Sequence, residues 1–390
     1  MKKLKRNHLL KTFWISLVIA TVIMAAAGCG SKQEEDVIKI GYIGALSGDT
    51  AVWGQAGLNG MKLTAKEINE RGGILGKKVV IIGMDGRGNP VDSINAFKKL
   101  IDEEKVLAVV GTNFSSCNIP MAAVADQKKV PLIATAASNP RVTVDEKGNV
   151  HPYSFRIGFI DPFQGEVLAG FAIKELKAKT AAVITDIGSD YSVGLTEFFI
   201  KKFEADGGKI LAKVDAHSGD NDFRAQLSKV APLNPDVILI PWIYKDVALI
   251  ANQARELGIK SVFLGGDGWD SKELLAMAGP ALEGCYYTSQ PSFARPITKP
   301  FYDKYMKEYN IVPETEALFG HDGLLWIEDA LKRAGKIDRE ALRDALENTK
   351  NFEGLLGTLT VDPATHNPSK PCSVYKIQSS QFEYIGDFTP

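Results

Sequence analysis

Short runs of hydroxyl, glycine, aromatic and acidic residues follow the apolar segments of this chain. Hydroxyls stand out in two of them, at Ser115 in the run 111–116 and at Ser138 in the run 134–138. The runs 185–191, 241–244 and 265–270 instead supply aromatic and acidic side chains. Hydroxyls and free backbone N–H groups can hold a carboxylate, and a carboxylate can balance an ammonium group. The two kinds of run together predict a binding site for a small molecule that carries both charges.

Individual residues in these runs have a functional and a structural interpretation. Ser115 stands where a helix should begin, so it can hold an anion or simply cap that helix. Asp267 lies between two glycines, where it can balance an ammonium group or serve as an ordinary turn residue. Four aromatic residues can wall an apolar cleft or belong to the core: Trp53, Tyr191, Tyr244 and Trp269.

The motifs of common catalytic sites are absent from the sequence. The glycines between Gly72 and Lys78 have the wrong spacing for a phosphate-binding loop, and 86–90 does not match a dinucleotide-binding fingerprint. No G-x-S-x-G motif is present. The five His residues are scattered, without a pair at metal-binding spacing. We therefore predict a binding protein that is not an enzyme and that uses no cofactor and no metal.

The N-terminus has the pattern of a targeting segment. Basic residues dominate 1–6, an apolar run covers 13–27, and Ala26, Ala27 and Gly28 precede Cys29. Small residues before a Cys resemble a bacterial lipobox, in which the Cys becomes the lipidated N-terminus; the alternative is a plain signal peptide with a chance Cys. We predict a signal peptide at 1–28, a lipidated Cys29 and a polar tether at 29–36.

Charge and cysteine content narrow the class further. Removing the five basic residues of the signal segment from the 46 leaves 41 against 47 acidic residues, a net charge of −6. The absence of a basic stripe argues against a nucleic-acid partner. Of the three later cysteines, Cys285 and Cys372 could pair, although the odd number favours unpaired, buried thiols.

Strand and helix patterns alternate along the rest of the chain. Between 37 and 137 we predict strands at 37–43, 78–84, 106–110 and 131–135, and helices at 54–71, 90–103 and 117–128. A second series has helices at 162–178, 191–206, 222–230 and 246–258, and strands at 181–185, 209–214, 236–240 and 261–264. A strand at 285–289, helices near 297–309, 315–335 and 338–347, a strand at 357–362 and a final extended stretch follow.

Two such series indicate an α/β protein with two doubly wound parallel-sheet lobes joined by three crossings. The first lobe is expected at 37–156 and 289–362, and the second at 157–288 and 363–390. Ligands of open parallel sheets bind beyond the carboxyl ends of the strands. The polar runs described above all lie at those ends.

Several long segments resemble one known family. They are IGYIGALSGDTAVWGQAGLNGMKLTAKEINERGGILGKKV, FRIGFIDPFQG and VALIANQARELGI. In this order they resemble the type I periplasmic binding proteins, specifically the Leu/Ile/Val-type substrate-binding subunits of ABC importers. The resemblance covers nearly all of 37–390.

The resemblance implies roles for matching positions. Ser115 and Ser138 would hold the carboxylate of an amino acid, the carbonyl of Ala136 would accept from its ammonium group, and Asp267 would pair with that group. Three positions would line the walls: Trp53, Tyr191 and Ile243. Ile243 stands where the family usually has Tyr, and the adjacent Tyr244 could take the place of that Tyr. Trp269 joins this set on the residue pattern alone.

The resemblance also implies a function. A monomeric, extracytoplasmic lipoprotein would capture a small amino acid, branched-chain or otherwise hydrophobic. It would deliver this ligand to an ABC permease with its ATPase subunits and would contact the membrane through the lipid anchor only. The alternative is a sensory receptor of the same fold that binds a short amide, urea or an aromatic acid.

Overall fold

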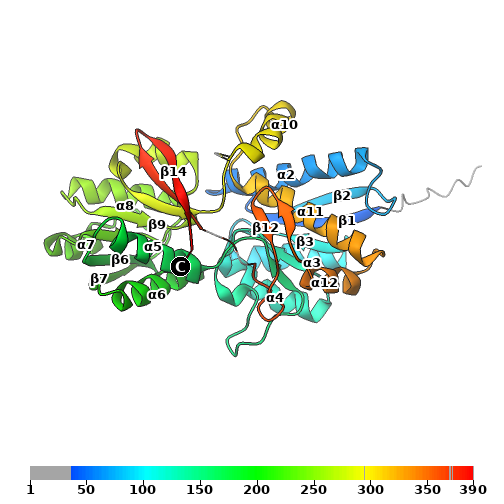
Figure 1. Cartoon of the computed structure of the whole chain (residues 1–390), viewed down its shortest axis with the longest axis horizontal. Coiled ribbons are helices and arrows are strands. Elements are labelled where there is room, and N and C mark those ends of the chain that lie inside the picture. The colour runs from blue at the N-terminus through cyan, green and yellow to red at the C-terminus, as the bar shows by residue number, and fades with distance from the viewer. Residues whose placement is uncertain (1–36, 294, 369, 371, 390) are drawn as a thin grey trace, which may run out of the picture. The chain divides into compact units, whose positions relative to one another are not determined.

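The first lobe is built on a parallel sheet of five strands in the order β2-β1-β3-β4-β5 (Figure 1). This computed structural model describes residues 37–293, 295–368, 370 and 372–389. The strands are β1 (Ile38–Gly44), β2 (Val79–Asp85), β3 (Ala108–Val110), β4 (Leu132–Ala134) and β5 (Ser154–Arg156). The short strands β3 and β4 are fully buried, as expected for parallel strands covered on both faces.

Helices from two distant parts of the chain cover this sheet. They are α2 (Ala51–Glu70), α3 (Pro90–Asp102), α4 (Ser115–Lys128), α11 (Glu316–Ala334) and α12 (Arg339–Glu347). Helix α10 (Lys299–Tyr309) packs against the outer side of α2, where its Tyr309 hydroxyl donates to the Asn59 carbonyl. Helices α2 and α11 cross so closely that a Cβ at Gly60 would lie 2.1 Å from the Ala317 carbonyl oxygen, and one at Gly320 would lie 2.0 Å from that of Gly57. Glycine at this crossing therefore fixes where the first residues of α11 lie.

The second lobe is built on a seven-stranded sheet in the order β14-β13-β10-β9-β8-β6-β7. Its strands are β6 (Thr180–Asp186), β7 (Lys209–Ala216), β8 (Val237–Leu239), β9 (Val262–Gly265), β10 (Tyr286–Ser289), β13 (Cys372–Gln378) and β14 (Gln381–Phe388). Its helices are α5 (Asp161–Lys174), α6 (Asp190–Ala205), α7 (Arg224–Val230), α8 (Tyr244–Glu256) and α9 (Lys272–Ala278). A separate two-stranded sheet pairs β11 (Phe352–Gly354) with β12 (Gly357–Leu359).

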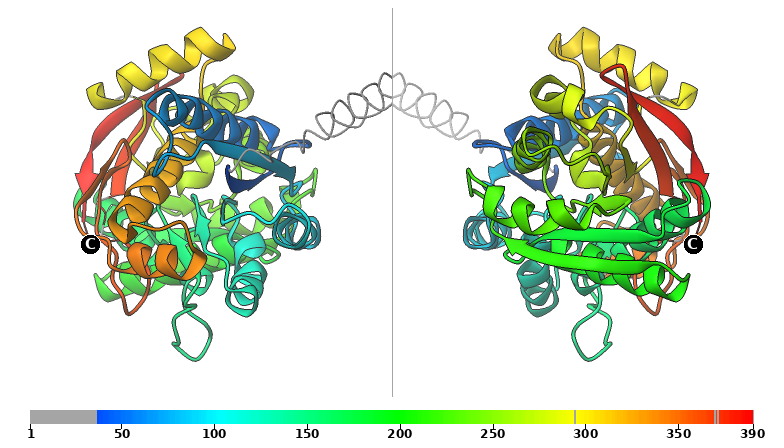
Figure 2. Two further views of the ribbon diagram at one scale, coloured as in Figure 1. Left: turned by 90° about the vertical axis from the view of Figure 1, so that its right-hand side faces the viewer. Right: turned by 90° about the vertical axis from the view of Figure 1, so that its left-hand side faces the viewer.

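The predicted fold class is confirmed, with one addition at the sheet edge. The strands β6 to β10 pair in parallel, but β13 pairs antiparallel with β10 and forms an antiparallel hairpin with β14. The final extended stretch is therefore this hairpin, seen in red at the edge of the second sheet (Figure 2).

Smaller differences concern single elements. Strand β5 and helix α9 were not predicted. The helix predicted at 162–178 ends at Lys174, and shortly afterwards Lys177 adopts a left-handed backbone with φ of 58°. The predicted lobe boundaries stay predictions, and so do the signal peptide, Cys29 and the tether, which lie outside the described residues.

Two further observations bear on earlier expectations. Cys117, Cys285 and Cys372 are all free and buried. Within the part of the chain that the structure describes, every helix is too short or too polar to span a lipid bilayer.

Candidate functional site

A cavity of about 710 Å³ lies where the loops after the strands of both sheets meet. From the first lobe it is lined by the loop before α2, the loop after β2, the start of α4, the loop after β4 and the start of α11. From the second lobe it is lined by loops after β6, β7, β8 and β9. The cavity therefore occupies the place that the sheet topology predicts for a ligand.

Six of the nine predicted site residues lie together in this lining, and one of the six, Ile243, is not the Tyr that is usual at this position. They are Trp53, Ser115, Ala136, Tyr191, Asp267 and Ile243. The other three predicted residues, Ser138, Tyr244 and Trp269, are not in the lining. Each of these three is buried nearby.

The N-terminus of α4 gives the cavity an anion-binding wall. Ser115 is the first residue of the helix, and Phe114 at the N-cap provides no side-chain cap. The first turn of α4 has no acidic residue, so the positive end of the helix dipole is not neutralised locally. The side chain of Asn118 accepts from the Thr112 N–H and donates to the Thr112 and Phe114 carbonyls, which fixes the loop before the helix.

Hydroxyls flank this helix start. The Ser115 hydroxyl accepts a hydrogen bond from the Asn139 N–H at 3.1 Å and is 2% exposed. Ser138 is buried, and its Oγ has no hydrogen-bond partner among the described residues. Ser138 also lies close enough to Asp161 to lower the pKa of that buried carboxyl, which burial otherwise raises. An oxyanion at this wall would meet backbone N–H groups and hydroxyls, and the cationic side chain of Arg87 also lines the cavity.

Asp267 provides the opposite chemistry from the second lobe. It follows β9 and opens a short 3-10 helix, Asp267–Trp269. Gln164 holds one side of the residue, since its Nε2 donates to Asp267 Oδ1 at 3.1 Å and its Oε1 accepts from the Asp267 N–H at 3.0 Å. The other carboxylate oxygen, Oδ2, is buried without a hydrogen-bond partner among the described residues.

Burial raises the pKa of Asp267 to about 7, although contacts with Gln164 and Tyr191 counteract the rise. A cationic group from a ligand would restore the ionised form and satisfy Oδ2. The flanking glycines have a packing reason. A Cβ at Gly266 would lie 2.4 Å from the Tyr191 hydroxyl oxygen, and one at Gly268 would lie 2.6 Å from the Trp242 carbonyl oxygen.

Aromatic residues divide between the wall of the cavity and the core behind it. Trp53 and Tyr191 line the cavity, and the Tyr191 hydroxyl accepts from the Gly268 N–H at 3.2 Å. The ring of Tyr244 packs edge-on against Trp53 at 4.9 Å. Trp269 is 0% exposed, and its Nε1 donates to the Ile240 carbonyl at 2.9 Å.

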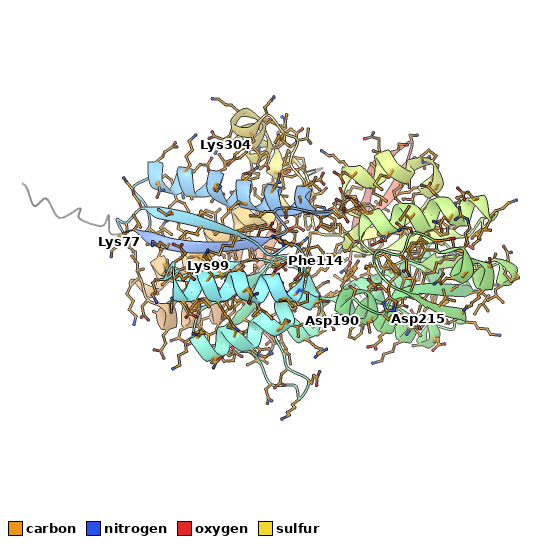
Figure 3. All side chains as sticks on the ribbon, turned by 180° about the vertical axis from the view of Figure 1, so that it is seen from behind. Lys77, Lys99, Phe114, Asp190, Asp215 and Lys304 are labelled. Atoms are coloured by element: carbon orange, nitrogen blue, oxygen red, sulfur yellow. The ribbon has the colours of Figure 1, made fainter. Side chains whose placement is uncertain are left out.

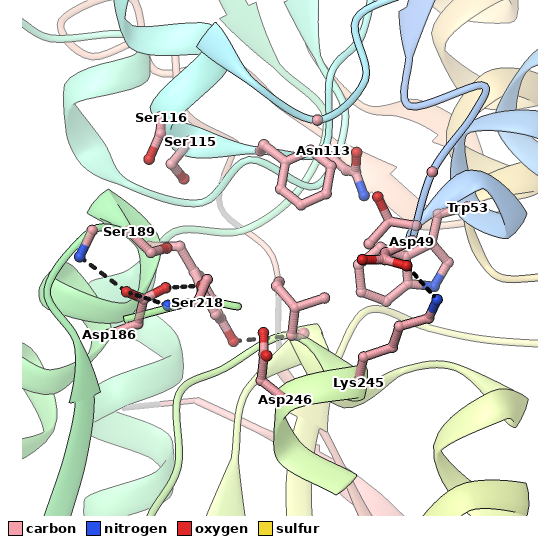
Figure 4. Close-up of a pocket in the computed structure, with 18 of the residues that line it drawn as sticks. Asp49, Trp53, Asn113, Ser115, Ser116, Asp186, Ser189, Ser218, Lys245 and Asp246 are labelled. Carbon is pink, nitrogen blue, oxygen red and sulfur yellow. Dashed lines mark hydrogen bonds and ion pairs between the residues drawn. The ribbon is translucent and has the colours of Figure 1, made fainter. Parts of the chain in front are cut away.

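Several lining residues were not among the predicted site residues (Figure 4). Asp186 accepts from the Gly188 N–H and from the hydroxyl of Ser218, and it closes one end of the cavity. Asp246 lies in the first turn of α8, and burial raises its pKa to about 6. Glu316, the first residue of α11, lines the cavity from a helix far along the chain. Asp186 belongs to a run that follows a predicted strand, so its position was visible in the sequence, whereas Glu316 follows no strand.

Contacts between the lobes bridge the cavity on more than one side. Trp53 Nε1 donates to the Asp270 carbonyl at 3.1 Å, and the Tyr244 hydroxyl donates to the Asp49 carbonyl at 2.7 Å. Near the start of α4, the Asp190 N–H donates to the Ser116 hydroxyl at 3.1 Å. Figure 3 labels Phe114 and Asp190 at this junction. A ligand between these bridges would be enclosed by both lobes.

Tyr244→Phe should weaken ligand binding without disturbing the fold. The lobes of such a protein are expected to part when the ligand leaves, so the hydrogen bond to Asp49 stabilises the enclosed form only. Losing one hydrogen bond costs about 0.5–1.5 kcal/mol, or roughly two- to tenfold in affinity. Phe keeps the ring contact with Trp53. Calorimetric titration measures the change, and equal affinities would show that this bridge contributes nothing to closure.

Metal ligands are not clustered in the part of the chain that the structure describes, where no group of three or more His, Cys, Asp or Glu residues could hold an ion. Neutral donors on one lobe and an unpartnered carboxylate oxygen on the other match a molecule with an anionic and a cationic end.

Comparison with known proteins identifies the family. The family model described as "Periplasmic binding protein" matches residues 37–381. The chain belongs to the periplasmic binding protein family. This is a family of binding proteins rather than enzymes, and it agrees with the resemblance drawn from the sequence.

Relatives narrow the family to its branched-chain amino acid class. The Leu/Ile/Val-binding protein BraC3 of Rhizobium johnstonii is 28% identical over 88% of this chain and 92% of its own. Leucine binding protein LivK of Thermotoga maritima is 36% identical, with a TM-score of 0.84 over 91% of this chain and 99% of that chain. LivJ of Streptococcus pneumoniae, solved in complex with isoleucine, is 31% identical, with a TM-score of 0.84 over 91% and 100%.

Not every similar binding protein holds an amino acid. A solute binding protein of Rhodopseudomonas palustris, solved with 3,4-dihydroxybenzoic acid, is 25% identical with a TM-score of 0.80 over 91% of this chain and 98% of that chain. The type I periplasmic binding protein fold is therefore shared by proteins with different ligands. The shared fold does not determine the ligand of this chain, which depends on the residues that line its own cavity.

Proposed function

We propose that this periplasmic binding protein captures a small amino acid outside the cytoplasm and delivers it to an ABC importer. One observation carries the choice of ligand. Among the described residues, Asp267 Oδ2 has no hydrogen-bond partner, and Asp267 lines the same cavity as Ser115 at the N-terminus of α4. An α-amino acid would place its carboxylate at the helix and its ammonium group at Asp267.

The other proposed contacts follow from this pose. Ser115 would hold the carboxylate, with the buried Ser138 hydroxyl as a second donor from behind the lining. The Ala136 carbonyl would accept from the ammonium group, and Trp53, Tyr191 and Ile243 would contact the rest of the ligand. Tyr244 and Trp269 would act from behind the wall, by bridging the lobes and by packing. The names of the relatives favour a branched-chain or another hydrophobic amino acid, which is the first class to test.

A thermal-shift screen of the mature protein against the common amino acids tests the proposal directly. A ligand present at a hundred times its Kd should stabilise the protein by about 2.7 kcal/mol. Calorimetric titration of the amino acids that raise the melting temperature would then rank them. If no amino acid raises it, the proposed ligand class is wrong.

An aromatic acid is the second candidate, because the Rhodopseudomonas palustris protein binds one. Such a ligand would use the anion-binding wall at α4 and the aromatic residues Trp53 and Tyr191. It has no ammonium group and would leave Asp267 Oδ2 buried without a partner. Benzoate and 3,4-dihydroxybenzoate belong in the same screen, and binding of these alone would favour this candidate over an amino acid.

The delivery role is proposed to depend on a lipid anchor at Cys29. Cys29→Ala should move the protein from the membrane fraction to the soluble fraction or leave it unprocessed, because the lipid is the only proposed link to the membrane. Fractionation followed by mass spectrometry of the N-terminus measures both. Cys372→Ala, which changes a buried thiol, serves as the matched control. A Cys29→Ala protein that is cleaved after Gly28 and still sediments with membranes would contradict the anchor.

A further inference from the structure

A small recess of about 20 Å³ opens beside the main cavity and shares Trp53, Ala136, Asp267 and Glu316 with it. This volume holds roughly one water-sized group. Carboxyl groups dominate its polar lining, since Asp270 joins Asp267 and Glu316, and none of its lining residues is Lys, Arg or His. The recess is therefore rich in acceptors.

Glu316 is the carboxyl group of this recess that most lacks a partner. It is only 9% exposed, and among the described residues none forms a hydrogen bond or an ion pair with its carboxylate. Its charged neighbours are the acids Asp267, Asp270 and Glu314, which together with burial raise its pKa well above the usual range. Asp270 is held differently, because the Ser289 hydroxyl donates to its Oδ2 at 2.7 Å.

A second side chain in the recess points to the same conclusion. Gln290 is 1% exposed, and both its Oε1 and its Nε2 are buried without a hydrogen-bond partner in the described part of the chain. Gln290 lines the recess together with Glu316. Its Oε1 would accept from a small donor group in the recess, while its Nε2 also has N–H donors without an acceptor.

The α-ammonium group of an amino acid has three N–H donors, and the proposed pose gives two of them to Asp267 and Ala136, so at most one remains for Glu316 and Gln290 together. In the proposed pose the carboxylate meets neutral donors at α4, and the ammonium group meets Asp267 and Ala136. A hydrocarbon side chain would add no further donor for either residue. Burying a carboxyl group in this way is costly whether it is ionised or protonated, because its hydrogen bonds to water are lost.

We propose that Glu316 and Gln290 form a second nitrogen-binding subsite, so that the ligand is an α-amino acid whose side chain ends in an ammonium or another N–H donor. This inference rests on the proposed function and refines its side-chain class beyond the hydrophobic amino acids that the relatives suggest. Trp53 and Phe319, which also line the recess, would pack against the aliphatic part of such a side chain.

Isosteric ligand pairs test the subsite. The compounds 2,4-diaminobutyrate and norvaline differ only in a terminal ammonium or methyl group, and so do ornithine and norleucine. Calorimetric titration of the wild-type protein should show the diamino compound of at least one pair binding at least about tenfold more tightly than its partner, as expected for a hydrogen bond to a charged group. Glu316→Leu should reverse that preference, and Glu316→Gln should reduce it.

Glu340→Gln is the matched control for removing an acid from the first turn of a helix. Glu340 is exposed in the first turn of α12 and does not line either cavity, so its substitution should leave the preference unchanged. Thermal unfolding without ligand verifies that each variant is folded.

Three outcomes would overturn the inference. Equal or tighter binding of norvaline and norleucine by the wild-type protein would show that the recess does not select nitrogen. A loss of affinity for every amino acid in Glu316→Leu would place Glu316 on the α-ammonium group instead. Failure of all four compounds, and of the common amino acids, would remove the proposed function together with the subsite.

Discussion

Asp267→Ala should reduce the affinity for an amino acid by at least about thirtyfold. The ligand's ammonium group would be enclosed between the lobes, where each charge needs a compensating partner. Truncating one member of a buried charge pair typically costs roughly 2–5 kcal/mol, and the low end of that range corresponds to about thirtyfold. The geometry explains why Asp267 should dominate. Its Oδ1 is already held by Gln164, while Oδ2 is left for the ligand.

Calorimetric titration of the wild type and the variant decides this prediction. Asp267→Asn keeps the shape and the contact with Gln164 but removes the charge, so it should also bind weakly. Asp222→Ala removes an exposed acid of the same lobe that pairs with Arg224, and it should bind as the wild type does. Near-equal affinities of wild type and Asp267→Ala would remove this residue from the site and favour an aromatic acid or amide as ligand.

The pH dependence of binding offers a second measurement on the same residue. With a pKa of about 7, Asp267 is mostly protonated at pH 6 and mostly ionised at pH 8. An ammonium group binds the ionised form, so one proton must leave and affinity should fall by about tenfold from pH 8 to pH 6. Four other acids that influence or face the same region also have raised pKa values and act in the same direction: Asp161, Asp246, Asp270 and Glu316. The part due to Asp267 is the part that Asp267→Asn abolishes.

The sequence was sufficient for most of the fold because local patterns and packing agree. Alternating strands and helices predicted two parallel sheets, and both sheets are present, the second with an antiparallel hairpin at its edge. The hairpin of β13 and β14 was harder to predict. Its burial differs between strands, since β13 is largely buried while β14 is mostly exposed or partly buried, and its partner β10 lies far back in the chain. Pairing over such a distance leaves no local signal.

The candidate site was predictable where it depends on strand ends. Ser115 and Asp267 both follow strands of the predicted parallel sheets, and the topology brings the ends of such strands together. Glu316 could not be predicted from strand ends, because it follows no strand. It begins α11, which belongs to the first lobe but comes after the second lobe in the sequence. Its place beside the cavity depends on the glycine crossing with α2, which fixes a contact between residues far apart in sequence.

Aromatic residues near strand ends were the least reliable part of the sequence argument. A Trp or Tyr has the same signature in a ligand wall and in the core beneath it. The structure separates them, since Trp53 lines the cavity while Trp269 is packed behind it. The role of Trp269 is therefore best tested through stability.

Trp269→Ala should lower the free energy of unfolding by about 3–5 kcal/mol, the usual cost of truncating a buried Trp. The ring is fully buried, stacks with Tyr287 at 6.4 Å, and fits so closely that a Cβ at Gly265 would lie 2.0 Å from it. The substitution also removes one of the two donors to the buried Ile240 carbonyl, which keeps only the Trp242 N–H. Denaturant unfolding of the ligand-free protein measures the loss. Trp269→Phe keeps most of the ring and should recover much of the stability. If Trp269→Ala unfolds at the wild-type midpoint and only ligand affinity falls, Trp269 belongs to the wall of the site and not to the core that supports Asp267.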